Sequence, residues 1–307
     1  MSNQPRFLIT IDTELSNFPR PLGLSSRLAG QDWGVRRMID VLDDLDVRAT
    51  FFLDVYAGND QDLGEQQRAA EMIATAGHDL QLHTHPGPAF DPRRERLRDY
   101  SPAEQEEILA LGCDRIREWT GTRPLLHRAG DWAADQHSLE ALSHRGFRAD
   151  FSASPWSRDC GLPEEIVNGN GWKRSAGLLC GVGTCYRDWL TGRVRRVDLG
   201  GVSFREATDV LAMQIDPLIL TLHSFSFLRY NRSRTHVAPF PDYIERLRRY
   251  CTLARERWHY RLSCALDAVT EIESRPGAAL PWSELRSSHS LSSCAGLLKS
   301  VRERLRA

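Results

Sequence analysis

The sequence lacks several features that mark large classes of protein. Its seven cysteines are scattered, odd in number and without a CxxC pair, which argues against a zinc ribbon and against a disulfide scaffold. It has no run of about 18 apolar residues that would predict a transmembrane helix. The first apolar stretch, Phe7–Ile11, is too short for the core of a signal peptide. These absences favour a cytoplasmic protein with reduced thiols.

An excess of charge of one sign is absent as well. The 40 Lys and Arg residues nearly balance the 41 Asp and Glu residues, which gives a net charge of -1. Neither a nucleic acid nor an anionic membrane is therefore indicated as a partner. Hydrophobic residues make up 41% of the 307 positions, enough for a substantial core, so we expect a globular protein.

Apolar, β-branched runs alternate with helical patterns along most of the chain. The predicted strands are Phe7–Ile11, Val47–Val55, Leu80–His83, Leu125–Arg128, Phe147–Phe151, Leu218–Leu222 and Tyr260–Ser263. The predicted helices are residues 32–45, Glu65–Ala76, Ser101–Trp119, Ser138–His144 and Tyr243–Trp258, with Ser101 a fitting N-cap. This alternation predicts a mainly parallel α/β sheet, and about seven such units favour closure into a barrel over an open sheet.

Two stretches give weaker indications. Residues 156–200 are rich in Gly, Trp and Cys and predict no clear element. Beyond about Arg275 the sequence becomes rich in Ser and then basic. We therefore interpret residues 5–272 as one barrel domain and residues 273–307 as a C-terminal extension, a helix or tail on its surface.

Polar side chains follow the ends of several predicted strands, where parallel α/β proteins carry their sites. Asp12 and Glu14 follow the first strand, His83 and His85 follow the third, and His223 follows a late apolar strand. Residues two apart in an extended chain point to one side. A carboxylate with two imidazoles can hold a divalent ion and leave one position open. A second carboxylate can act as general base, and a histidine opposite can protonate a leaving amine.

Each of these residues also has an ordinary structural interpretation. An Asp-x-Glu after a strand is often a helix cap or a solvated turn, and an HxH pair can hydrogen-bond loop backbone. Arg128 and Asp150, which also stand at predicted strand ends, are compatible with a plain ion pair. All of them stand at strand ends of one barrel-like pattern, and that coincidence favours a catalytic site.

Motifs over about residues 6–272 resemble, in order, those of the polysaccharide deacetylases, the NodB-homology group of carbohydrate esterase family 4. The matching segments are Thr10–Glu14, Arg48–Phe52, Gly77–Gly87, His127–Trp132, Phe147–Ser152 and Leu222–His223. The resemblance implies a distorted (β/α)7 barrel that hydrolyses an N-acetyl or O-acetyl group from a sugar.

The resemblance also implies roles for individual residues. Asp12 resembles the general base, and Glu14 and His83 resemble metal ligands. The second metal histidine of the family would fall on Gly87, so the sequence departs from the pattern there, and His85 is the obvious substitute at a shorter spacing.

The remaining motifs supply the other expected site residues. His223 resembles the general acid, and Leu222 would line the acetyl pocket. Arg128 would keep Asp12 ionised, since a nearby cation favours the charged form. Asp150 would orient either the histidine acid or Arg128, and Trp132 is a candidate for substrate binding.

The expected activity is therefore removal of an acetyl group, with N-acetyl favoured, from a sugar, an oligosaccharide or a glycan precursor. One divalent ion is implied, with zinc favoured and cobalt, nickel or manganese as alternatives. Two rival functions remain open at this point. The chain could be a metal-dependent hydrolase of a small non-peptide C–N substrate on the same barrel, or a catalytically silent relative that binds glycan.

Overall fold

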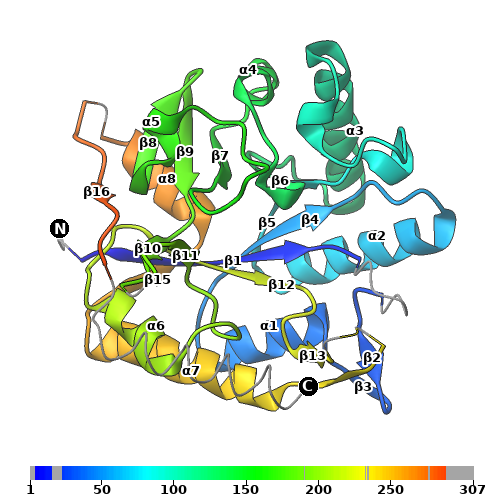
Figure 1. The fold of residues 1–307 in the computed structure, drawn as a ribbon. Coiled ribbons are helices and arrows are strands. Elements are labelled where there is room, and N and C mark those ends of the chain that lie inside the picture. Colours follow the sequence, from blue (N-terminus) through cyan, green and yellow to red (C-terminus); the bar gives the residue numbers. More distant parts are fainter. Residues whose placement is uncertain are drawn as a thin grey trace.

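A strongly curled ten-stranded sheet forms the centre of the molecule (Figure 1). The computed structural model describes residues 4–15, 23–189, 191–231, 233, 235–275 and 277–287. The strands follow the order β12-β1-β4-β5-β6-β7-β9-β8-β16, and β15 pairs with the start of β1. The predicted α/β fold with a distorted barrel is thereby confirmed.

The parallel part of the sheet contains the strands that the sequence predicts. These are β1 (Arg6–Thr13), β4 (Thr50–Asp54), β5 (Asp79–Thr84), β6 (Leu126–Ala129), β7 (Ala149–Ala153), β12 (Leu218–His223) and β15 (Arg261–Ser263). All eight residues of β1 are buried. Strands buried on both faces need near-continuous apolar sequence, which is why these runs can be recognised from composition alone.

Eight helices of the described residues surround this sheet. They are α1 (Val35–Asp44), α2 (Asp60–Thr75), α3 (Pro102–Thr120), α4 (Gln136–His144), α5 (Glu164–Val167), α6 (Phe204–Leu211), α7 (Pro241–Glu256) and α8 (Ala265–Glu273). Figure 1 shows α3 beside α4 on one flank, and α6 beside α7 on another. Among the described residues, no helix is both long and apolar enough to cross a membrane.

Helix α3 shows how local sequence sets an element's ends. Ser101 accepts a hydrogen bond from the backbone N–H of Glu104, whose side chain accepts one from the Ser101 N–H. Pro102 occupies the first helical position, where no N–H is needed. Gly121 ends the helix in the left-handed conformation, at a φ of 73°.

The stretch without a clear pattern, residues 156–200, forms antiparallel structure. Strands β8 (Gly169–Ser175) and β9 (Leu178–Val182) extend the main sheet as a hairpin, and β10 (Cys185–Arg187) pairs with β11 (Val194–Arg196). Two further small hairpins are β2 (Arg27–Leu28) with β3 (Gln31–Asp32), and β13 (Leu228–Tyr230) with β14 (Val237–Pro239). Short 3-10 turns lie at η1 (Gly87–Ala89), η2 (Leu97–Asp99) and η3 (Gly130–Trp132).

The sheet ends inside the segment interpreted as a C-terminal extension. Strand β16 (Trp282–Glu284) pairs antiparallel with β8, so this piece of the extension belongs to the main sheet. Residues 288–307 lie outside the described part of the chain. The domain boundary at residue 272 stays a prediction.

Candidate metal centre

Asp12, Arg128 and His223, three of the proposed site residues, lie on the inner face of the curled sheet, whereas Leu222 packs in the apolar core on the other face. Leu8 belongs to a small apolar cluster with Phe52, Leu126 and Phe151, and successive residues of a strand point to opposite faces. Thr10, Asp12 and Glu14 therefore continue on the face of Leu8, towards the carboxyl end of β1. This alternation places the polar residues at one end of the barrel, next to the apolar cluster that fills its interior.

Three of these side chains come together as a potential metal centre. One ligand atom each from Glu14, His83 and His85 lie within 4.8 Å of one another. Glu14 Oε2 lies 2.6 Å from His85 Nε2 and 3.5 Å from His83 Nε2. His83 Nδ1 lies 2.9 Å from the carbonyl oxygen of Arg128. Because a carbonyl can only accept, Nδ1 carries the hydrogen and Nε2 is left to face Glu14.

The electrostatics of the group favour a charged carboxylate. Burial acts to raise the pKa of Glu14, but hydrogen bonds and positive charge from His83 and His85 outweigh it and hold the pKa well below its usual value. Burial acts to lower the pKa of His85, but Glu14 raises it to about 9. Two imidazole nitrogens and one carboxylate oxygen form a donor set that could hold a divalent metal ion.

The shorter spacing of His85 is accommodated by a glycine on the neighbouring strand end. A β-carbon added to Gly130 would lie 2.4 Å from Cε1 and 2.5 Å from Nε2 of His85. The imidazole thus rests against the bare Cα of Gly130. Gly87, at the position of the missing family histidine, lies in the turn η1.

Asp12 is held as an ion pair beside this group. Arg128 Nη1 donates to Asp12 Oδ1 at 2.6 Å, and Nη2 donates to Thr10 Oγ1 at 2.9 Å. Both Asp12 and Arg128 are almost fully buried. Burial acts to raise the pKa of Asp12, but the charges of Arg128, His83 and His223 leave it lowered. The sequence-based expectation that Arg128 contacts Asp12 agrees with this geometry.

A buried polar network behind Arg128 fixes its strand. His127 Nδ1 lies 2.8 Å from Asp150 Oδ1, and His127 Nε2 lies 3.1 Å from Thr84 Oγ1. Ser152 donates to Asp150 and accepts from the Ala129 N–H. Asp150 was expected to orient the histidine acid or Arg128; its carboxylate instead holds His127, the residue before Arg128. Thr84 lies between His83 and His85, so the network also anchors their strand.

His223 lies across the site from the imidazole pair. It pairs in register with Asp12 along the parallel strands β12 and β1, and its Nε2 lies 3.9 Å from Glu14 Oε1. Burial lowers the pKa of His223, although Asp12 and Glu14 act to raise it. The ring stacks on Phe225, with centroids 5.1 Å apart.

The two predicted substrate-binding residues differ in exposure. Leu222 is buried beside His223, at 2% relative exposure. Trp132 is half-buried, packs edge-to-face on Trp156 and has the guanidinium of Arg196 5.2 Å above its ring.

A cavity of about 710 Å³ opens beside Glu14 and His85. Its wall includes Asp54, a buried residue at the end of β4 whose Oδ1 accepts from the His85 N–H. Sequence reasoning singled out neither Asp54 nor His127. Asp54 stands at a strand end like the other site residues, so the same criterion applied to every strand would have included it. The hydrogen bond between His127 and Asp150 joins two different strands, so it can be recognised only in the three-dimensional structure.

Comparison with known proteins gives one family match. A model of the polysaccharide deacetylase family matches residues 30–149, a range that contains His83, His85 and Arg128. Asp12, Glu14 and His223 lie outside the matched range. A search of curated protein sequences gives no match.

Several solved structures resemble this one at low sequence identity. A Mycobacterium smegmatis protein described as a polysaccharide deacetylase has a TM-score of 0.59 and 16% identity, over 89% of this chain and 92% of that one. A pseudoenzyme of carbohydrate esterase family 4 from Bacillus anthracis gives 0.49 and 16%, over 94% and 70%. A peptidoglycan deacetylase from Bacillus subtilis gives 0.42 and 14%, over 89% and 94%. At 16% identity, the similarity to the Mycobacterium smegmatis protein shows a common fold.

Proposed function

We propose that this chain, a divergent member of the polysaccharide deacetylase family, is a metal-dependent hydrolase that removes an acetyl group from a sugar or glycan precursor. N-acetyl is favoured over O-acetyl. The observation that carries the proposal is the group of Glu14, His83 and His85, with ligand atoms within 4.8 Å, beside an Asp12 held by Arg128.

The donor set fits a divalent ion. Two imidazole nitrogens and one carboxylate oxygen suit zinc, with cobalt, nickel or manganese as alternatives. The hydrogen bond from His83 Nδ1 to a backbone carbonyl is the kind of outer contact that orients metal-binding histidines. An ion in this place would supply Lewis acidity towards the carbonyl oxygen of an acetyl group.

The protein side chains would then divide the proton transfers between them. Asp12, kept ionised by Arg128, would accept a proton from the attacking water. His223, on the adjacent strand, would donate a proton to the departing amine. Leu222 would line the acetyl pocket, and Trp132 would contact the sugar. Asp150 would act at a distance, through His127 and the strand that carries Arg128.

The direct test is acetate release from a panel of N-acetylated sugars, with zinc, cobalt, nickel or manganese added to metal-free protein. We expect one equivalent of bound metal and acetate release that depends on it. His85→Ala should lose both, because a three-ligand site has no spare ligand. Full metal binding by His85→Ala would refute its assignment. Stoichiometric metal without acetate release would leave a non-acetyl C–N substrate, and no bound metal would indicate a silent glycan-binding relative.

A further inference from the structure

We infer that the substrate carries a protonated amine as well as its acetyl group, and that this amine binds in the acidic cavity beside Glu14 and His85. The inference rests on the proposed function, since it names the substrate class of the same site. It depends on two independent observations, the shape of the cavity and the charge of its wall.

The cavity has the size and position of a substrate pocket. Its volume of about 710 Å³ lies within the range of roughly 300–1,000 Å³ that is typical of small-molecule sites. Glu14 and His85, two of the proposed metal ligands, form part of its wall. A ligand whose acetyl group reaches the metal centre therefore extends into this space.

The charged groups of the described wall are almost all carboxylates. Five line the cavity, Glu14, Asp54, Asp62, Glu65 and Glu95, whereas its described lining contains no Lys or Arg and His85 as the sole histidine. A neutral acetylated sugar does not need such a wall.

Two of the five carboxylates already form hydrogen bonds or ion pairs with other residues of the site. Glu14 faces the imidazoles of His83 and His85. Asp54, only 7% exposed, accepts from the N–H groups of Tyr56 and His85 and from the side chain of Gln66. These two are needed to shape the proposed metal centre.

The other three carboxylates, Asp62, Glu65 and Glu95, have no ion-pair partner in the described chain. Glu65 accepts the backbone N–H of Leu24, and Asp62 accepts from the side chain of Asn59. Neither contact neutralises a negative charge. The wall away from the metal centre therefore presents three carboxylates towards the cavity.

Such a wall selects among candidate substrates by charge. A concave site lined by one sign of charge concentrates ligands of the opposite sign. An ammonium group gains charge-assisted hydrogen bonds from carboxylates, whereas a phosphate-linked precursor is repelled. The ammonium could belong to an amino sugar next to the acetylated one, or to an aliphatic diamine acetylated at its other end.

The experiment compares substrates of equal chemistry at the acetyl group. Acetate release by the metal-loaded protein is measured on fully acetylated glucosamine oligomers, on partly deacetylated oligomers of the same length and on a mono-acetylated aliphatic diamine. We expect at least one amine-bearing substrate to exceed the neutral oligomer in kcat/KM by about 10-fold or more at low salt. That advantage should shrink as salt is added. Whichever amine is preferred identifies the source.

A paired variant tests the wall itself. Asp62→Asn combined with Glu95→Gln removes two charges and retains shape, so it should raise KM for the amine-bearing substrate and reduce the advantage of that substrate over the neutral oligomer. Glu256→Gln, an exposed carboxylate at the end of α7, serves as the matched control. Calorimetric binding of glucosamine oligomers and of the free diamine gives a readout that does not need turnover.

The outcomes separate the two proposals. Equal kcat/KM for neutral and amine-bearing substrates, insensitive to salt and to the paired variant, would overturn the inference and leave the deacetylase proposal intact. Absence of acetate release, with amine binding that weakens in the paired variant, would retain the cationic pocket and refute the proposed reaction. Absence of amine binding together with no turnover would refute both.

Discussion

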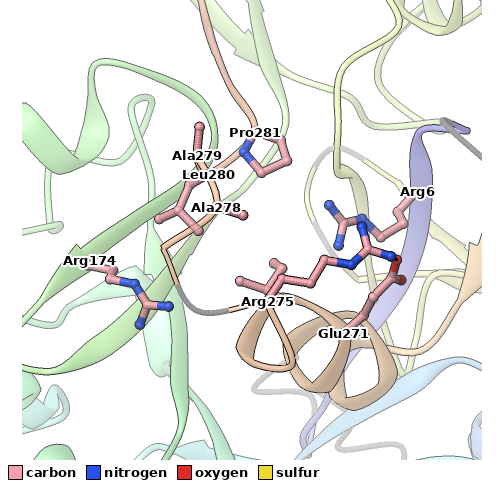
Figure 2. Close-up of a pocket in the computed structure, with 9 residues that line it drawn as sticks. Arg6, Arg174, Glu271, Arg275, Ala278, Ala279, Leu280 and Pro281 are labelled. Atoms are coloured by element: carbon pink, nitrogen blue, oxygen red, sulfur yellow. Dashed lines mark hydrogen bonds and ion pairs between the residues drawn. The ribbon is translucent and has the colours of Figure 1, made fainter. Parts of the chain in front are cut away.

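The acidic cavity beside Glu14 and a smaller recess beside Arg6 lie near opposite ends of β1. They differ in whether the charged side chains of their walls form ion pairs within the protein. The recess, of about 100 Å³, is lined by Arg6, Arg174, Arg275 and Glu271 (Figure 2). Arg6 donates to both carboxylate oxygens of Asp216, at 2.9 and 3.0 Å. Glu271 pairs with both Arg275 and Arg261.

The comparison separates two uses of charged residues. In the recess, Arg6 pairs with Asp216 and Arg275 pairs with Glu271, so these charges contribute to stability. In the cavity, three carboxylates have no ion-pair partner among the described residues and face a space about seven times larger. Carboxylates that have no ion-pair partner within the protein and line a large cavity indicate that a bound ligand supplies the positive charge. Variants at the cavity end should therefore change function, and variants at the recess should change stability.

The largest expected effect lies at the cavity end, at the proposed base. Asp12→Asn keeps the shape of the side chain and removes its basicity, so turnover should fall by about 10²–10⁴-fold while the metal stays bound. Acetate release and metal content are measured on the same preparation. Asp267→Asn, in an exposed ion pair with Arg48, is the control. Near-normal turnover in Asp12→Asn would transfer the role of base to another group, with Glu14 the first to reconsider.

The next largest effect should appear at Gly130, which contacts the proposed metal ligand His85. Gly130→Ala places a methyl group where the imidazole now lies, so the ring must move away from Glu14. Displaced supporting contacts of this kind cost about 10–100-fold in metal affinity. Metal titration gives the affinity, and Gly64→Ala, in an open part of α2, is the control. Unchanged affinity would show that His85 is not a ligand.

At the recess, Arg6→Met should lower the stability of the protein and leave its activity unchanged. It removes a largely buried guanidinium and two hydrogen bonds to Asp216. Hydrogen bonds to charged groups contribute about 1.5–3 kcal/mol, so the free energy of unfolding in urea should fall by about that amount. Arg36→Met, in an exposed pair with Asp40, should change it far less. If Arg6→Met lowered kcat and left the free energy of unfolding unchanged, the distinction between a functional cavity and a stabilising recess would be wrong.

The smallest effect is a pH dependence at the recess. The hydrogen bond from Arg261 is the main reason why the pKa of Glu271 lies below its usual value. A lowered folded pKa means that this stabilisation is present above about pH 4, the usual glutamate pKa, and is lost as pH falls through the folded value. Glu271→Gln should therefore narrow the stability difference between pH 7 and pH 3, by less than about 1 kcal/mol because the pair is partly exposed. An unaltered pH profile of unfolding would contradict the assignment.

The sequence alone was sufficient for the parallel half of the fold and for the residues at its mouth. Buried parallel strands must be apolar, so β1, β4 and β12 can be recognised by composition, and any polar residue at their ends is conspicuous. Asp12, Glu14 and His223 were found in this way. Helix α3 was also predictable, because Ser101 and Pro102 determine its start locally.

The antiparallel part was not predictable for a physical reason. Strands β8 and β9 contain glycines whose missing side chains make room for aromatic rings; a β-carbon at Gly181 would lie 2.8 Å from Phe151. Such positions respond to tertiary packing, which carries no periodicity along the chain. The pairing of His127 with Asp150 is likewise a contact between residues 23 positions apart on different strands, and neither residue identity alone indicates it.

Strand β16 has a consequence for the handling of the protein. Its three residues pair with the first three residues of β8, Gly169–Gly171, and the ammonium group of Lys173 lies 3.8 Å from the centre of the Trp282 ring. Removing the chain after residue 276 would leave a row of unpaired backbone donors and acceptors at the rim of the sheet. An uncovered edge of this kind is a template for pairing with other chains. Shortened versions that end there should therefore self-associate, even with the barrel mouth intact, and a truncation placed after residue 287 should not.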